Sequence, residues 1–233
     1  MQKIVKELTQ RVINKYSQQK EIEAYSLAVK MGLTQIEKIL IEKWLKRKGK
    51  ILDIGCAAGR VSIALAKLGF DVVGIDVAPK MIKTARLQAK KCGVSVKFKV
   101  KDAVKINFPS NSFDYVLMFR MIQHVPLRIN RIKILKKIWK ILKRGGILIF
   151  LITFIPKKNL IQIPPKKRLE EGDYFINTVS AVKSSGKAFW HVYKIKEVIK
   201  EIKSADFKIE EKIFSNDIEH GHKENIVFFV CKK

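Results

Sequence analysis

The sequence feature that most constrains the fold is a strand, a glycine-rich turn and a helix in direct succession. Residues 50–59 read KILDIGCAAG, and residues 60–69, RVSIALAKLG, carry apolar side chains at helical spacing. Such a unit brings a ligand against the backbone N–H groups at the N-terminus of the helix. Gly55 and Gly59 provide the backbone freedom, and lack the Cβ atom, that so close an approach requires. The sequence therefore predicts an α/β fold with a ligand site at this turn.

The acidic residue before the turn decides which ligand fits there. The dinucleotide-binding pattern G-x-G-x-x-G, placed on Gly55, fails because Ala57 and Arg60 stand where it needs glycines. Asp53 lies two positions before Gly55, at the carboxyl end of the expected strand. A carboxylate there repels a pyrophosphate and attracts an ammonium or another cationic group. The turn is therefore suited to a cationic ligand.

Residues 53–59, DIGCAAG, resemble motif I of the class I S-adenosylmethionine-dependent methyltransferases, which usually reads (Asp/Glu)-x-Gly-x-Gly-x-Gly. Ala57 replaces the middle glycine and adds one methyl group to the turn. A second expected strand, 71–76, ends in Asp76 roughly 20 residues beyond the glycines, where a doubly wound sheet places an acid that binds ribose. The spacing of the two acids supports the resemblance.

Further matches to this family follow in order along residues 50–153. Expected strands at 95–100, 112–118 and 147–153 resemble the third, fourth and fifth strands of the family. The resemblance implies S-adenosylmethionine as the cofactor, with its ribose on Asp76 and its adenine amino group on Asp102. The residues that it implies for cofactor binding are Asp53, Gly55, Cys56, Ala57, Gly59, Asp76, Val77, Met81, Asp102, Ala103, Phe119 and Arg120.

Each of the three acids also has a purely structural interpretation. Asp53 could cap a helix or lie in a loop, Asp76 could be the N-cap before Pro79, and Asp102 could be a solvated turn residue. All three, however, follow successive strands at their carboxyl ends, the edge at which open α/β sheets bind ligands. As a set they favour a binding site.

A chain of 233 residues with 47% hydrophobic content is expected to form one domain around one large core. The alternation of strands and helices, with the family resemblance, predicts a doubly wound, Rossmann-like, seven-stranded and mostly parallel sheet with an antiparallel last strand and helices on both faces. We expect four regions: an N-terminal helical cap (1–49), a cofactor-binding core (50–153), an acceptor-site insertion (154–192), and a closing helix and β-hairpin (193–233) with a polar loop at 215–223. Residues 1–31 are either a lid over the cofactor or a flanking helical segment that only packs.

The sequence indicates a cytoplasmic protein without stable membrane insertion. The longest apolar run, 146–152, is far short of the roughly 20 residues that span a bilayer, and the N-terminus lacks the apolar stretch of a signal peptide. Three scattered cysteines have neither disulfide nor metal-ligand spacing, so we expect no metal site.

Methyl transfer from a sulfonium needs alignment of the acceptor more than it needs catalytic side chains. A general base is required only when the acceptor carries a proton with a high pKa. Two histidines are weak candidates. The resemblance places His124 in a segment that lines the methionine end of the cofactor and the acceptor site, and His191 lies in the aromatic stretch FWHVY. Both could instead have packing roles.

The methyl acceptor is predicted mainly from charge. Lys and Arg number 48 against 21 Asp and Glu, a formal net charge of +27, with basic stretches at 43–50, 128–144 and 156–168. Such a surplus attracts polyanions, and parts of the chain resemble tRNA wobble-uridine methyltransferases, which esterify a carboxymethyl group on the base. We therefore expect an RNA acceptor, with tRNA as the candidate that the resemblance implies.

Three alternatives to this expectation remain open. The charge could reflect an Ile- and Lys-rich genome composition. The acceptor could be a small or lipid-like molecule such as a quinone precursor. The chain could also be a non-catalytic nucleic-acid-binding protein that kept the fold. The sequence does not identify a protein partner.

Overall fold

The computed structural model describes residues 1–155, 157–176, 187–219 and 222–233. The strands are β1 (Lys50–Ile54), β2 (Asp71–Asp76), β3 (Lys97–Val100), β4 (Phe113–Phe119), β5 (Leu142–Phe154), β6 (Leu160–Gln162), β7 (Asp173–Ile176), β8 (Ala188–His191), β9 (Lys208–Glu219) and β10 (His222–Lys232). The α-helices are α1 (Gln2–Tyr16), α2 (Gln19–Met31), α3 (Gln35–Trp44), α4 (Arg60–Lys67), α5 (Pro79–Lys91), α6 (Arg128–Ile141) and α7 (Ile195–Lys203). The 3-10 turns are η1 (Ala103–Lys105), η2 (Ile122–His124), η3 (Lys157–Asn159) and η4 (Pro165–Lys167).

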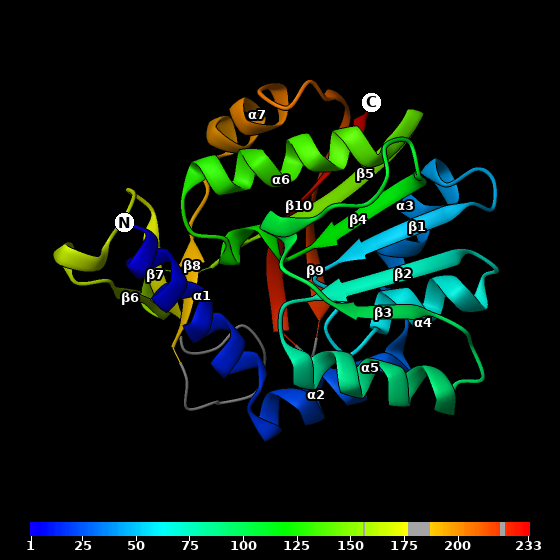
Figure 1. Ribbon diagram of the computed structural model, residues 1–233, viewed down its shortest axis with the longest axis horizontal. Coiled ribbons are helices and arrows are strands. Elements are labelled where there is room, and N and C mark those ends of the chain that lie inside the picture. The colour runs from blue at the N-terminus through cyan, green and yellow to red at the C-terminus, as the bar shows by residue number, and fades with distance from the viewer. Residues whose placement is uncertain (156, 177–186, 220–221) are drawn as a thin grey trace.

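Seven strands form the main sheet in the order β3-β2-β1-β4-β5-β10-β9 (Figure 1). The neighbours from β3 to β5 are parallel, and β10 inserts antiparallel to both β5 and β9. The predicted fold class is confirmed. The closing hairpin is longer than predicted, because β9 and β10 extend through most of the segment 215–223 that was expected to be a loop.

Helices cover both faces of this sheet because successive strand residues point to opposite sides. Leu52 and Ile54 of β1 belong to a core with α6 and α7, whereas Ile51 belongs to a second core with α3 and α4. Local signals set where the helices begin. Thr34 and Glu37 form a reciprocal capping box at α3, and α5 begins at proline. Among the described residues, no helix is long and apolar enough to cross a membrane.

A second sheet, β6-β7-β8, forms within the segment expected to be an insertion. Figure 1 shows it beside the main sheet, with α1 lying across it. Leu8 and Val12 of α1 pack in one apolar cluster with Phe189 and Trp190 of β8, and all four side chains are buried. This sheet was not predicted. Its short strands are stabilised by burial against α1, which lies far away in the sequence.

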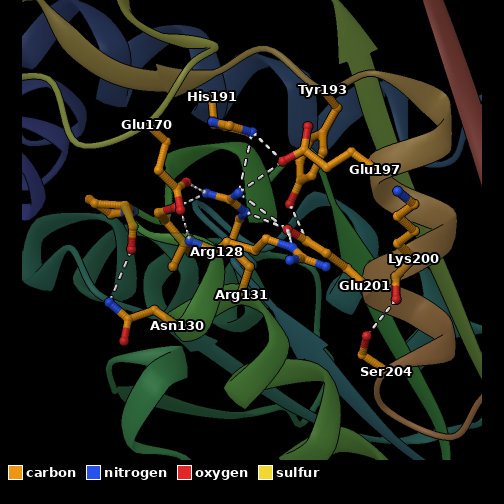
Figure 2. Close-up of polar contacts among 12 residues, drawn as sticks. Arg128, Asn130, Arg131, Glu170, His191, Tyr193, Glu197, Lys200, Glu201 and Ser204 are labelled. Carbon is orange, nitrogen blue, oxygen red and sulfur yellow. Dashed lines mark hydrogen bonds and ion pairs between the residues drawn. The ribbon is translucent and has the colours of Figure 1, made fainter.

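A buried arginine attaches the small sheet to the main domain. Arg131 of α6 is 0% exposed and binds carboxylates of Glu170, Glu197 and Glu201 at 2.9, 3.2 and 3.2 Å. Its guanidinium also lies 5.3 Å from the centre of the Tyr193 ring. Figure 2 shows these groups converging on Arg131 from the segment before β7 and from α7. One cation therefore links α6, α7 and the insertion.

His191, at the end of β8, belongs to the same network. Its Nδ1 lies 2.8 Å from Asp173 Oδ1, and its Nε2 lies 2.9 Å from Glu197 Oε1. Burial would lower the pKa of His191, but the hydrogen bonds to Asp173 and Glu197 outweigh burial and raise it. Glu170, Asp173 and His191 are also close enough to share a cation. Here the Glu170 carboxylate binds Arg131, and Asp173 binds His191.

Replacing Arg131 tests this attachment. Arg131→Met leaves buried carboxylates without their cation, and we expect it to lower the free energy of unfolding by about 3–5 kcal/mol. The matched control is Arg128→Met, whose side chain is 47% exposed in its ion pair with Glu201, so that we expect a change of about 1 kcal/mol or less. Urea denaturation followed by circular dichroism measures both. Equal effects of the two substitutions would contradict the assignment of Arg131 as the attachment point.

The raised pKa of His191 predicts how stability depends on pH. Its stabilising contribution is fully present below the ordinary histidine pKa of about 6.5 and is lost as pH rises through the higher folded value. Wild type and His191→Gln should therefore differ most in unfolding free energy near pH 6 and differ less as pH rises. Urea denaturation over a pH series measures that difference. A gap that widens with pH would show that the pKa of His191 is not raised.

Candidate active site

A cavity of 870 Å³ lies where the carboxyl ends of β1, β2 and β4 meet the underside of α1. In Figure 1 these strand ends point toward α1. The lining comes from the turn after β1, the ends of β2 and β4, the η1 and η2 turns, the start of α6, and the inner faces of α1 and α2. Segments far apart in the sequence therefore enclose one space at the ligand-binding edge of the sheet.

The turn after β1 follows a path that requires small residues. Gly55 has φ +78°, and a Cβ there would lie 2.5 Å from Met121 Cγ. Ala57, which stands where the family has glycine, also has a left-handed φ of +45°. Gly59 does not line the cavity, and a Cβ on it would lie 2.9 Å from Phe98 Cζ. The first two residues thus shape the cavity wall, whereas Gly59 lets α4 pack closely against β3.

Asp53 presents a buried carboxylate to this cavity. Its side chain accepts a 2.5 Å hydrogen bond from Ser62 Oγ, and the residue is only 3% exposed. Burial raises the pKa of Asp53 to about 6, although the Ser62 hydrogen bond and the nearby Arg60 oppose the rise. A ligand cation beside this carboxylate would compensate its loss of hydration.

Asp76 is held in place by the backbone around it. Its two carboxylate oxygens accept from the backbone N–H groups of Ala57, at 3.1 Å, and Ala78, at 2.8 Å. Each oxygen keeps a further lone pair, so the carboxylate can also accept from two neighbouring hydroxyls of a ligand. Burial raises the pKa of Asp76, and the backbone donors oppose that rise. Asp76 therefore braces the turn after β1 and faces the cavity at the same time.

Asp102 caps the short η1 turn. Its Oδ1 accepts from Val104 N at 2.9 Å, which leaves Oδ2 for another donor. Asp102 and Ala103 both line the cavity. The structural interpretation of Asp102 as a turn residue and its interpretation as a ligand contact are thus compatible, because each uses a different oxygen.

The structure brings together every predicted cofactor residue except Gly59. Those lining the cavity are Asp53, Gly55, Cys56, Ala57, Asp76, Val77, Met81, Asp102, Ala103, Phe119 and Arg120. Their positions at the ends of four neighbouring strands follow from the parallel pairing of β1 with β2 and β4 and of β2 with β3.

A tyrosine and a histidine meet on the same cavity wall. Tyr16, the last residue of α1, lies with its hydroxyl 2.9 Å from His124 Nε2. His124 Nδ1 lies 2.8 Å from the carbonyl oxygen of Phe189, so Nδ1 carries the proton and donates. Burial lowers the pKa of His124 to about 4, which keeps the ring neutral near pH 7. Nε2 is therefore an acceptor, and the Tyr16 hydroxyl donates to it.

The sequence did not reveal Tyr16, although it did suggest a cap at residues 1–31. The two partners are 108 positions apart, and only docking of α1 on the small sheet brings them together. A buried ion pair fixes the bend between α1 and α2: Lys15 Nζ lies 2.8 Å from Glu21 Oε1, with side chains 0% and 2% exposed. Tyr25 of α2 lines the cavity beside Tyr16.

Two expectations for the acceptor side need correction. His191 does not line the cavity but belongs to the Arg131 network, because β8 turns its end toward α6 and α7. None of the described residues of 154–192 lines the cavity either. This segment acts on the site indirectly, by supporting α1 and by supplying the Phe189 carbonyl that orients His124. We therefore give His191 no direct role in the reaction.

The cavity fits S-adenosylmethionine by the chemistry of its polar groups. The buried carboxylate of Asp53 suits an ammonium, Asp76 offers lone pairs to a pair of hydroxyls, and Asp102 retains an oxygen for an amino group. The Cβ-free wall at Gly55 allows close approach to the backbone.

Comparison with known proteins identifies the same domain. A methyltransferase-domain family model matches residues 52–150. The ubiquinone biosynthesis O-methyltransferase of Xanthomonas campestris pv. campestris is 37% identical over 105 residues, which are 45% of this chain and 42% of that protein. The chain thus matches less than half the length of this curated relative.

Two solved structures resemble the whole fold. An S-adenosylmethionine-dependent methyltransferase of Methanosarcina mazei is 25% identical with a TM-score of 0.72, over 87% of this chain and 98% of that one. A protein from Pyrococcus horikoshii OT3 is 27% identical with a TM-score of 0.68, over 84% and 86% of the two chains. Together, these similarities show that residues 52–150 form a methyltransferase domain and that the chain has the fold of S-adenosylmethionine-dependent methyltransferases.

Proposed function

We propose that the protein transfers a methyl group from S-adenosylmethionine to a hydroxyl group of a small molecule bound beneath α1. One observation carries the proposal: a single cavity joins the three strand-end carboxylates to the Tyr16–His124 pair. The first group suits the cofactor, and the second suits a hydroxyl that must lose a proton.

A small acceptor replaces the RNA acceptor expected from net charge. The relative named for ubiquinone biosynthesis supports a small molecule, and the relatives named above give no support to the resemblance to tRNA methyltransferases. The roof formed by α1 also favours a compact acceptor, since Val12, Ile13 and Tyr16 face into the cavity. A high net charge describes the field of the whole surface and does not identify what enters one cavity.

The chain's own residues would mainly bind and orient the cofactor and the acceptor. S-adenosylmethionine, when bound, supplies a methyl carbon activated by its sulfonium. Asp53, Asp76 and Asp102 would hold the cofactor at the sheet edge, and the α1 roof would exclude water from the cavity.

The Tyr16–His124 pair would receive the proton of the acceptor. Tyr16 stays protonated because burial raises its pKa well above the ordinary value. Its oxygen can accept from an acceptor hydroxyl while its own proton is donated to His124 Nε2. The low pKa of His124 makes it a weak base, so we expect it to take the proton only as positive charge develops on the hydroxyl oxygen that attacks the methyl carbon.

The charge of Asp53 predicts how cofactor binding depends on pH. Because burial raises the pKa of Asp53 to about 6, S-adenosylmethionine should bind more weakly below that pH, by up to about tenfold for each unit. Calorimetric titration over a pH series measures this. Asp53→Asn should bind weakly at every pH. Ser62→Ala should move the midpoint upward, because the Ser62 hydrogen bond lowers this pKa.

The matched control for cofactor binding is Asp76→Asn. It should weaken binding at all pH values through the lost acceptor for ribose hydroxyls, and it should move the midpoint downward, opposite to Ser62→Ala, because the charge of Asp76 raises the pKa of Asp53. Folded protein that binds no S-adenosylmethionine at neutral pH would refute the proposed function.

The acceptor class is tested by transfer of labelled methyl groups. Protein and methyl-labelled cofactor are incubated with a small-molecule extract and, separately, with total RNA from the same cells. We expect label in the small-molecule fraction. His124→Asn retains a donor for the Phe189 carbonyl but lacks Nε2, and should lower turnover about a hundredfold while cofactor affinity stays unchanged.

Tyr16→Phe is the companion variant, and it should lower turnover as His124→Asn does, because both break the same proton path. Label found only in RNA would end the small-molecule proposal. Wild-type turnover in both variants would remove the Tyr16–His124 pair from the mechanism.

A further inference from the structure

The charged residues that line the cavity are acids at strand ends and a larger set of lysines and arginines. Among the described lining residues, the acids are Asp53, Asp76 and Asp102, all at strand ends. The arginines and lysines of the lining are Lys6, Arg60, Lys101, Lys105 and Arg120. The cofactor described above would use all three carboxylates, so any further charged ligand in this cavity meets mainly cations.

The two arginines lie near the carboxylate of Glu37, which does not line the cavity. Arg60 binds Glu37 through two contacts of 2.6 and 2.7 Å and also donates to Gly32 O at 2.7 Å. Burial would raise the pKa of Glu37, but Arg60 and Arg120 together lower it. Arg60 therefore serves the connection between α2 and α3, and Arg120 lies near enough to Glu37 to lower its pKa.

Lysines gather beside η1, around the carboxylate of Asp102. Lys101 donates to the Asn107 side-chain amide oxygen and lies 5.5 Å from the centre of the Phe108 ring. Burial lowers the pKa of Lys137 on α6, and the charges of Lys133 and Lys101 lower it further, with only Asp102 opposing. Positive charge thus accumulates between η1 and α6, and Lys105, which ends η1, also lines the cavity.

Lys6 adds a cation from the roof. It lies on α1 and lines the cavity together with Lys101 and Lys105. The cavity volume of 870 Å³ is near the upper end of the range for small-molecule sites, about 300–1,000 Å³, so it can hold the cofactor with a compact second ligand.

We propose that the methyl acceptor carries an anionic group, a carboxylate or a phosphate ester, and that Lys101 and Lys105, with Lys6 above them, bind this group. The inference rests on the proposed function, because it assigns the carboxylates to the cofactor and the lysines to the acceptor. An anion there lies in the positive field of Lys101, Lys133 and Lys137, and the Tyr16–His124 pair, which lines the same cavity, receives the hydroxyl. The acceptor is thus a small hydroxy acid or hydroxy-phosphate rather than a neutral phenol or alcohol.

The test compares ligands that differ only in charge. The intact protein saturated with S-adenosylhomocysteine is titrated with 4-hydroxybenzoate and with 4-hydroxybenzamide, its neutral counterpart, and 4-hydroxyphenyl phosphate represents the phosphate source. We expect the anions to bind about tenfold more tightly than the amide at low salt, with the preference shrinking as salt is added.

Substitutions test which lysines cause the preference for anions. Lys101→Met/Lys105→Met should abolish the preference for the anions and leave affinity for S-adenosylhomocysteine unchanged. Lys136→Met, an exposed position of α6 that does not line the cavity, should keep the preference. Lys6→Met should weaken anion binding from the roof side.

The outcomes separate this inference from the proposed function. Normal binding of S-adenosylhomocysteine with equal affinity for acid and amide would overturn the anionic acceptor alone. A preference for anions that persists in the double lysine variant would place the site elsewhere and also overturn it. A single-stranded RNA oligonucleotide that displaces 4-hydroxybenzoate and accepts label would replace the small acid by a polyanion. Failure to bind S-adenosylhomocysteine would instead count against the proposed function.

Discussion

The attachment of the small sheet through Arg131 is the interaction on which the active site depends. Its carboxylate partners and His191 fix the end of β8, and Phe189 lies two residues earlier on that strand. The Phe189 carbonyl sets the proton position on His124, and the buried aromatic residues of β8 carry α1. A charge cluster outside the cavity therefore supports the roof of the cavity and sets the protonation state of His124, which lines it.

The acidic and the basic side chains of the cavity differ in how rigidly the fold holds them. The carboxylates follow strands, so backbone and helix-start donors hold them at fixed positions, as with Asp76. The lysines stand on a short turn and on helix surfaces, where long side chains can adapt to a ligand. In the proposed reaction the cofactor would thus bind to rigidly held carboxylates, and the acceptor would bind to flexible lysines.

Much of the fold and the cofactor side was predictable, because periodicity and strand-end acids are local signals. The bounds of β2 and the positions of Asp53 and Asp76 follow from a few consecutive residues. The β6-β7-β8 sheet and Tyr16 were not predictable, since both depend on contact between α1 and a segment some 150 residues later. His191 was placed correctly in an aromatic cluster, yet only the folded chain shows that its partners are Asp173, Glu197 and Arg131. The expected RNA acceptor rested on net charge and on a resemblance of parts of the chain, and net charge carries no information about where on the molecule a ligand binds.

The position of Tyr16 at the very end of α1 has a consequence for how the enzyme would work. The residue that seals the cavity is also one half of the proton path, so the reacting groups are complete only while the roof is docked. Any movement of α1 away from the cavity would separate Tyr16 from His124. In the proposed reaction an open site would thus be chemically incomplete, and the roof that excludes water would also complete the reacting groups.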